Sequence, residues 1–225
     1  EFETDGFVED MVVLPDEIED RVYYSVRRTL GGLTVRTFEL WAREDQCQGG
    51  LLNRQGDCHV VYDGDPTTTI DVPHLDGMTV VIWADGKAYP QQVVTDNNVT
   101  FDEPVSKAMI GLYYKSAYKG AKLITQIPQD VGVTGTKKIQ LLGLLLNNTH
   151  YQGIKYGSDF ERMYDLPQVE DGRLTPEDTV WEHFDKDSME FDGVWDPDQR
   201  VCLQAEAPKP CTVLGLMVHM NQSNK

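Results

Sequence analysis

The sequence predicts an all-β fold of antiparallel strands, with a small β-barrel or sandwich domain, a second β-rich domain and little helix. Apolar and polar residues alternate from Leu75 to Tyr114, and the chain reverses at Asp85-Gly86 and again near Asn97-Asn98. Asp-Gly and Asn tolerate the positive φ angles of tight turns, so these dipeptides favour β-hairpins. Gly31-Gly32, between two alternating segments, predicts another hairpin.

Three strands are predicted near the start of the chain, at residues 8–14, 21–29 and 33–41. In the second strand, Val22, Tyr24 and Val26 share one face, and Tyr23, Ser25 and Arg27 share the other. A lone three-stranded meander is marginal in water, so we expect these strands to belong to a larger sheet or propeller blade. The Arg27-Arg28 pair is too small to form a basic patch.

The middle of the chain predicts a loop and then a compact β unit. Residues 42–59 have no period and hold several glycines, whereas residues 60–114 predict five or six short strands with turn residues every 8–12 positions. Residues 115–136 form a connecting segment. The domains expected are residues 1–43, a hairpin region continuing a larger β body; residues 44–119, a small β-barrel; and residues 120–225, a C-terminal β-rich domain.

The last third also predicts strands. Residues 139–147 are apolar on both faces, as in a strand buried on both sides, and residues 151–157 are expected to be its hairpin partner. Residues 201–207 and 211–220 are expected to pair across Pro208-Lys209-Pro210. The segment 156–200 holds 14 acidic and 4 basic residues. Its large apolar side chains should anchor it: Phe160, Met163, Leu166, Trp181, Phe184, Phe191 and Trp195.

Composition limits the functions that fit. The chain has 225 residues, with 20 basic and 37 acidic side chains and a formal charge of −17, which argues against a protein that grips nucleic-acid phosphates. The charge suits solubility, or a wall past which nucleic acid slips. The sequence contains no apolar run of 18 residues, so no transmembrane helix is predicted. The chain starts at Glu1 without Met, so either its start was removed or it is a piece of a longer protein.

The four cysteines and five histidines show no local metal-binding spacing. Two disulfides are conceivable on count alone, but free, mostly buried thiols are the favoured interpretation of Cys47, Cys58, Cys202 and Cys211. The histidines are expected to be structural or solvated: His59, His74, His150, His183 and His219. Calcium is an alternative at the Asp pairs 63/65, 185/187 and 196/198, but no EF-hand spacing is present and turn formation explains them better.

Catalytic signatures are also missing from the sequence. Glu182, Asp185 and Asp187, beside Trp181 and Phe184, could be imagined as a glycosidase pair, but they equally form a solvated face with aromatic anchors. There is no G-x-S-x-G, no Walker loop and no G-x-G-x-x-G. We therefore assign no catalytic, cofactor-binding or metal-ligating residue, and we do not expect an enzyme.

Three blocks resemble the C-terminal part of tail nozzle proteins of short-tailed bacteriophages, the tail tubular protein B family. The first is RVYYSVRRTLGGLTVRTFELW at 21–41, similar to the strand pair that ends the family's large β body. The second, at 60–116, contains LDGMTVVIWADG and resembles a small barrel of phage tail proteins. The third comprises IQLLGLLLNNTHYQGIKYG and WDPDQRVCLQAEAPKPCTVLGLMVHM, similar to the family's last domain, with Cys211 where a small residue is usual.

The resemblance implies a structural protein of the virion tail. Six copies would form the nozzle ring, in contact with the tail adaptor ring and tail fibres, and the genome would pass through the bore without specific binding. Contact with the host cell surface is a further implied role. The family offers no catalytic residue to transfer.

Two other functions are kept as alternatives. One is a host-surface or glycan-binding module, in which Trp181, Phe184 and Trp195 would stack on sugars. The other is a hydrolase of cell-wall polymer that uses Glu182 or Asp187.

Overall fold

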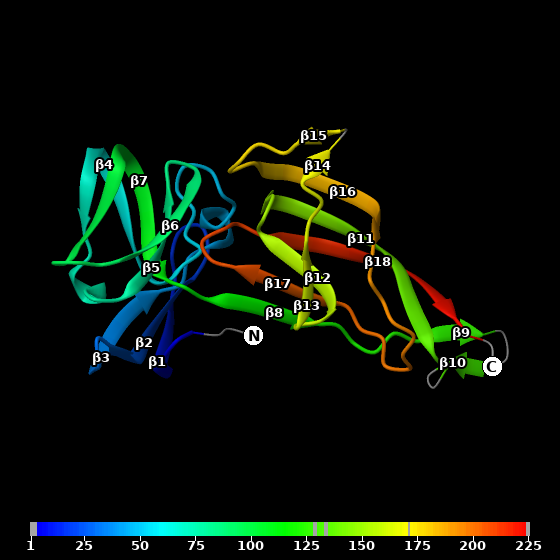
Figure 1. Ribbon diagram of the computed structural model, residues 1–225. Helices are drawn as coiled ribbons and strands as arrows, with labels where there is room; N and C mark the ends of the chain where they lie inside the picture. Colours follow the sequence, from blue (N-terminus) through cyan, green and yellow to red (C-terminus); the bar gives the residue numbers. More distant parts are fainter. Residues whose placement is uncertain (1–3, 128–129, 133–134, 171, 224–225) are drawn as a thin grey trace. The chain divides into compact units, whose positions relative to one another are not determined.

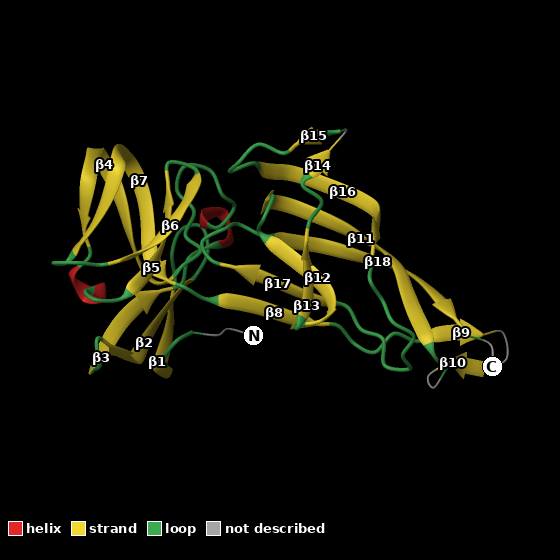
Figure 2. Cartoon of the chain, in the orientation of Figure 1, coloured by secondary structure: helices red, strands yellow, loops and turns green. Residues whose placement is uncertain are grey.

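The computed structural model describes residues 4–127, 130–132, 135–170 and 172–223. The chain is built almost entirely from antiparallel strands, which confirms the all-β prediction (Figures 1 and 2). It divides into two compact units, Glu1–Tyr114 with Glu206–Pro210, and Lys115–Ala205 with Cys211–Lys225. The first unit therefore combines the N-terminal strands with the middle β unit. The three-part domain division drawn from the sequence stays a prediction.

The first unit begins with a meander of three strands in the order β1-β2-β3: β1 (Phe7–Leu14), β2 (Arg21–Leu30) and β3 (Leu33–Leu40). Gly31 and Gly32 turn the chain with φ angles of 55° and 80°, which confirms the predicted hairpin. One face of β2 is buried and includes Tyr24 and Val26, as the alternation predicts. Among the described residues no further strand joins this sheet. Membership of a larger sheet stays a prediction.

The second sheet of this unit has four strands in the order β4-β7-β5-β6: β4 (Asp57–Asp71), β5 (Thr79–Ala84), β6 (Lys87–Val93) and β7 (Asn98–Leu112). Short 3-10 turns, η1 (Glu44–Gln46) and η2 (Pro73–Leu75), lie before β4 and before β5. The prediction of five or six short strands is wrong, because Gly64-Asp65-Pro66 forms a bulge in β4, where the register shifts between Asp63 and Thr67. Pro66 is tolerated since β4 is an edge strand.

Both predicted reversals in this sheet exist. Asp85 and Gly86 have φ angles of 48° and 87° between β5 and β6. The second reversal uses Asp96 and Asn97, with φ angles of 51° and 65°, one residue earlier than predicted.

The four-stranded sheet curls without closing. Alternate residues of β5 and β7, such as Ile82 and Ile110, are fully buried in one core. Tyr89 on β6 contacts Phe101 on β7 edge to face at 5.4 Å, although these strands are not neighbours in the sheet. In the described residues β4 and β6 do not pair, so the sheet is a rolled, open one rather than a closed barrel.

The second unit contains two main sheets. One has the order β16-β11-β18, and the other has the order β13-β12-β17-β8. Their strands are β8 (Lys115–Lys119), β11 (Lys137–His150), β12 (Ile154–Asp159), β13 (Arg162–Asp165), β16 (Val180–Glu190), β17 (Cys202–Glu206) and β18 (Thr212–Gln222). Two small hairpins add β9 (Thr125–Ile127) with β10 (Asp130–Gly132), and β14 (Val169–Glu170) with β15 (Arg173–Leu174).

The central strand β11 confirms the predicted strand over residues 139–147, and its Leu142, Leu144 and Leu146 are almost fully buried. They share a core with Tyr156 and Leu203 from the second sheet. The segment 115–136 was expected to be a connection, but it contributes β8 as an edge strand.

Two predicted hairpins are wrong. β11 pairs with β16 and β18 rather than with residues 151–157, which enter the other sheet as β12. β17 and β18 do not pair with each other, because the link between them belongs to the first unit. There the Ala207 N–H donates to the Tyr114 carbonyl at 3.1 Å, and Asn53 Nδ2 donates to the Pro208 carbonyl at 2.7 Å. These two hydrogen bonds fix the 206–210 connection in place of the tight turn that was predicted there.

The expected anchors of the acidic segment are only partly correct. Leu166, Phe184 and Phe191 are buried, but Phe160 is 42% exposed and Trp195 is 52% exposed. Phe160 lies in the turn between β12 and β13, and Trp195 lies in the loop after β16. Neither position projects into the core.

Candidate functional site

The carboxylates considered for glycoside hydrolysis lie on β16 and do not converge. Glu182 and Asp185 are an odd number of residues apart in a stretch of regular pairing, so they project to opposite faces of the sheet. The Glu182 side chain is 85% exposed. The side chain of Asp187 lies outside the described part of the structure. The arrangement of Glu182 and Asp185 therefore cannot place two carboxylates on either side of one sugar.

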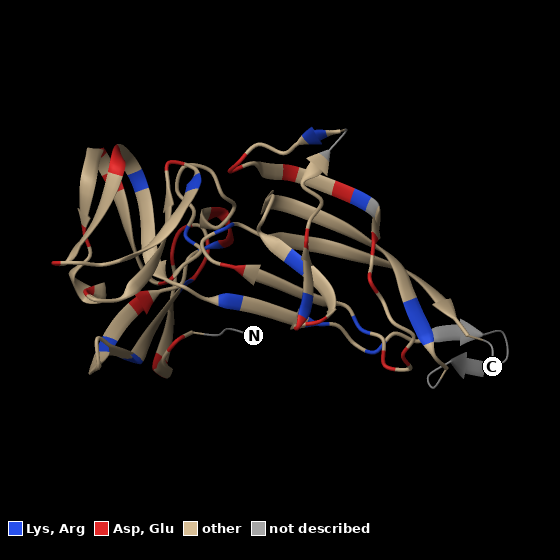
Figure 3. Ribbon diagram, in the orientation of Figure 1, with Lys and Arg blue, Asp and Glu red and all other residues tan. Residues whose placement is uncertain are grey.

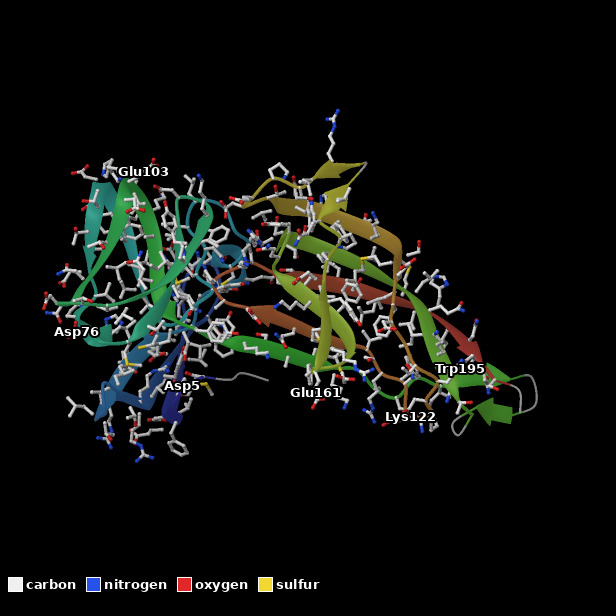
Figure 4. The ribbon with its side chains drawn as sticks, viewed as in Figure 1. Asp5, Asp76, Glu103, Lys122, Glu161 and Trp195 are labelled. Atoms are coloured by element: carbon white, nitrogen blue, oxygen red, sulfur yellow. The ribbon has the colours of Figure 1, made fainter. Side chains whose placement is uncertain are left out.

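The aromatic residues considered for glycan stacking are separated too. Trp181 and Phe184 pack together with ring centroids 4.6 Å apart, and Trp181 is paired with Thr149 near the end of β11. Trp195, labelled in Figure 4, precedes Asp196, and Asp196 forms a β-bridge with Lys137 at the start of β11. At ~3.4 Å per residue, the two ends of β11 are roughly 40 Å apart. The three aromatics therefore do not form one platform.

Two of the histidines and one of the paired aspartates have partners that give them a structural role. His59 Nδ1 lies 2.8 Å from the Gly56 carbonyl, and His74 Nε2 lies 3.1 Å from the Cys58 carbonyl. Asp196 Oδ1 accepts the Asp198 N–H at 2.6 Å, the geometry of a turn-forming aspartate. Among the residues that the structure describes, no group of three His, Cys, Asp or Glu side chains could hold a metal ion.

The four cysteines are free, as the favoured interpretation predicted. Cys58 and Cys202 are buried, and Cys47 and Cys211 are half-buried. Burial raises the pKa of the Cys47 thiol to about 11 and that of the Cys58 and Cys211 thiols to about 12. Thiols with such pKa values are poor nucleophiles at neutral pH.

The feature that stands out is a concentration of exposed apolar side chains on the N-terminal meander. Every residue of β1 is exposed, although six of its eight side chains are apolar. Ten large apolar residues between positions 7 and 41 are exposed: Phe7, Val8, Met11, Val12, Val13, Leu14, Ile18, Leu33, Phe38 and Trp41. Single exposed apolar residues are ordinary, whereas a group of neighbouring ones on one face is typical of an interaction surface.

Part of this group forms what we call the outer face of the meander, the side opposite buried Tyr24 and Val26. The pairing register brings together on it the side chains Phe7, Val12, Leu14, Tyr23, Phe38 and Leu40. Tyr23 and Phe38 stack with ring centroids 5.6 Å apart, and the Arg27 guanidinium lies over the Phe7 ring at 5.3 Å. Aromatic rings and arginine are the side chains enriched at protein interfaces.

The charges of the outer face are concentrated around one carboxylate. Arg27 and Arg36 are directly opposite each other on β2 and β3. Glu9, in the bulge of β1, lies 3.5 Å from Arg27 and 2.7 Å from Arg36. The hydrogen bond from Arg36 lowers the pKa of Glu9, so Glu9 stays ionised. These three residues carry one net positive charge in a chain of net charge −17.

The opposite face of the meander contains a buried ionic network centred on Arg28. This side chain is 1% exposed. Its guanidinium donates to both Asp57 oxygens at 2.7 and 2.8 Å and to both Glu39 oxygens at 2.8 Å. Nη2 also lies 2.8 Å from the Thr4 hydroxyl, and Nη1 donates to the Asp5 carbonyl at 3.1 Å. Two bidentate pairs thus fix β2 to β3 and to the first residue of β4.

The sequence did not predict this network, because Arg27 and Arg28 were considered only as a pair too small for a basic patch. The signal was present in the alternation. Arg28 continues the series Tyr24, Val26 on the buried side of β2, whereas Arg27 belongs to the outer face. A charged residue in register with a buried face needs a partner of opposite charge.

The Arg28 network predicts a dependence of stability on pH. Burial alone would raise the pKa of Asp57, but hydrogen bonds from Arg28, Asp5 N–H and Thr4 outweigh it and lower the pKa. A lowered carboxyl pKa contributes stability above the unfolded-state value of about 3.9, and this contribution is lost as pH falls through the folded-state value. We expect the free energy of unfolding to hold to about pH 5 and to fall below about pH 4. Urea denaturation at a series of pH values measures it.

The variant Asp57→Asn, which cannot titrate at this position, tests whether Asp57 causes the loss of stability in acid. The variant should start less stable at neutral pH, and the difference between the two proteins should shrink in acid. A constant difference at all pH values would show that Asp57 is not the titrating group.

Comparison of the sequence with models of known protein families and with curated proteins gives no match. In the described residues no helix has the length and hydropathy that a membrane span requires.

Proposed function

We propose that this chain is a structural component of a bacteriophage tail and forms part of the nozzle ring through which the genome is ejected. The observation that carries the proposal is the outer face of the meander, with its exposed Phe7, Val12, Leu14 and Phe38. A structural subunit needs a well-ordered surface that a neighbour covers, and the Arg28 network fixes this sheet to β4 of the same unit. The three sequence blocks that resemble nozzle proteins support the same role.

The separation of the side chains considered for catalysis and glycan stacking is compatible with this role. Glu182 and Asp185 diverge on β16, and Trp195 is far from Trp181. A passive wall needs neither a catalytic cluster nor a metal. The protein would act as a homo-oligomer, a hexamer by resemblance, in contact with the tail adaptor ring and tail fibres.

The net charge of −17 suits a conduit for DNA, because acidic side chains facing a bore repel phosphate. The genome would then pass without specific binding. Localisation in the tail of the virion follows from the same proposal.

Electron microscopy of the purified chain in negative stain, with mass measurement over a range of protein concentrations, tests the proposal. We expect hollow rings of several copies that increase with concentration. Particles that remain monomeric and bind a glycan array would instead favour a host-surface module. Such a module would need a binding surface other than the separated Trp181, Phe184 and Trp195.

A further inference from the structure

The edge strand β18 is unlike the other edges of the described sheets. It is eleven residues long and contains no Asp, Glu, Lys, Arg or Pro. In the part of the chain that the structure describes, β18 pairs with β11 alone. None of its residues is buried, and Leu214 is 66% exposed. A long, uncharged edge presents main-chain N–H and C=O groups to any strand that approaches it.

Other edges carry the devices that prevent such pairing. The opposite edge of the same sheet, β16, is charged along its length, and Figure 3 shows β16 in red and blue where β18 has neither colour. The blocking features on the remaining edges are a bulge at Glu9 in β1, Arg36 in β3, Pro66 in β4, Pro90 in β6, Lys115 and Lys119 in β8, and Arg162 in β13. β18 is the edge among these with no charge and no proline, and its one irregularity is a bulge at Leu214, near its start.

We propose that β18 pairs antiparallel with β18 of a second copy of this chain, about a twofold axis near Met217. Met217 is the midpoint of Thr212–Gln222, and the regular part of this register runs from Gly215 to His219, since the bulge at Leu214 interrupts the strand. Met217 then faces its own equivalent, and His219 of each copy lies opposite Gly215 of the other. Leu216 and Val218, which pack against the core of the unit, come opposite each other and extend that core across the junction.

The absence of charged residues from β18 allows a second copy as the occupant. Two chains of net charge −17 repel each other, so a self-contact is stable only where no charged side chains oppose one another. The register centred on Met217 creates no charged cross-strand pair, since β18 holds no Asp, Glu, Lys or Arg.

Closure favours the twofold arrangement. Joining two β18 edges gives a six-stranded sheet in which β16 of each copy forms the outer edge. Both ends of the joined sheet are then charged, and the pairing stops at two copies. Six strands is an ordinary sheet size, and the regular shared edge, Gly215–His219, is roughly 17 Å long at ~3.4 Å per residue. This contact goes beyond the proposed function, because a ring uses head-to-tail contacts between different surfaces.

Cysteine cross-linking of the full chain tests the register. Met217→Cys places two thiols directly across the junction, where paired Cα atoms are about 4.5–5.5 Å apart, within reach of a disulfide. We expect oxidation to give a covalent dimer on a non-reducing gel. His219→Cys is the matched control, because its two thiols are four residues out of register, roughly 13 Å apart. The unaltered chain, with its own four cysteines, gives the background.

Sedimentation of Met217→Lys tests the contact without oxidation. Two lysines facing each other should raise the dimer dissociation constant at least about tenfold, since like charges directly opposite destabilise a strand pair. Ser188→Lys adds the same charge to exposed β16 and should leave the dimer intact. Circular dichroism shows whether each variant is folded, and Leu214→Glu replaces Met217→Lys if that chain is not.

Three results would overturn the inference: an unaltered chain that is monomeric at every concentration, cross-linking at position 219 instead of 217, or dimers unaffected by both charged variants. Rings that form but ignore Met217→Lys would remove this contact and leave the proposed function standing.

Discussion

Replacing Arg28 by methionine is expected to lower the free energy of unfolding of the first unit by about 3–5 kcal/mol. Methionine fills a similar volume but leaves the Asp57 and Glu39 carboxylates beside a space with no cation. Both carboxylates accept two hydrogen bonds from the guanidinium, and its removal strands their charge in a largely buried site. Urea denaturation followed by tryptophan fluorescence measures the loss, since fully buried Trp83 reports on this unit.

Arg27→Met is the matched control. Arg27 is the neighbouring residue of the same strand, but its side chain is 46% exposed and its ion pair with Glu9 is screened by solvent. Its loss should cost about 0–1 kcal/mol. Equal effects of the two variants would contradict a special role for the buried network. Arg28→Lys should fall between them, because lysine keeps the charge and loses the fork of donors.

The elements that the sequence predicts well are those whose cause is local. The reversals at Gly31-Gly32 and Asp85-Gly86 depend on φ angles that only a few residues tolerate, so the dipeptide itself identifies the turn. The buried side of β2 follows from alternation. The strand β11 follows from a run that is apolar on both faces.

Pairing between distant strands could not be predicted in the same way. β18 and the sequence after β11 were expected to pair with their nearest neighbours along the chain. In the structure, β18 reaches β11 across more than sixty residues, and β12 crosses to the other sheet. Which strands pair depends on where the connections between them are fixed in the fold. Asn53 fixes the 206–210 link through a hydrogen bond that spans 155 positions of sequence, and no local pattern encodes it.

The candidate surface shows the same division. The apolar residues of β1 are visible in the sequence, and so is their alternation. Only the structure shows that these residues stay exposed, because their exposure depends on whether other segments of the chain pack against them. Arg28 was within reach of sequence reasoning, but its two partners come from β3 and β4 and become adjacent only on folding.

Phe38→Glu is expected to abolish assembly through the outer face while the monomer stays folded. Phe38 is 72% exposed, so the fold does not depend on burying it. In a covered interface an aromatic anchor of this kind contributes about 2 kcal/mol or more, and its loss raises the dissociation constant about 30-fold or more. The new carboxylate also costs free energy, since covering the face would remove it from water. Mass measurement at a series of concentrations records the shift toward monomer.

Thr34→Glu separates this local effect from general repulsion. Thr34 lies on the same strand and the same face as Phe38, is exposed, and is paired with Thr29 near the hairpin turn, away from the Tyr23–Phe38 stack. Both variants add one negative charge to the chain, so their long-range repulsion is equal. If both assemble poorly, net charge rather than the aromatic stack controls association. If Phe38→Glu assembles like the unaltered chain, the outer face is not the surface that neighbours cover, and the exposed strand β1 must serve another partner.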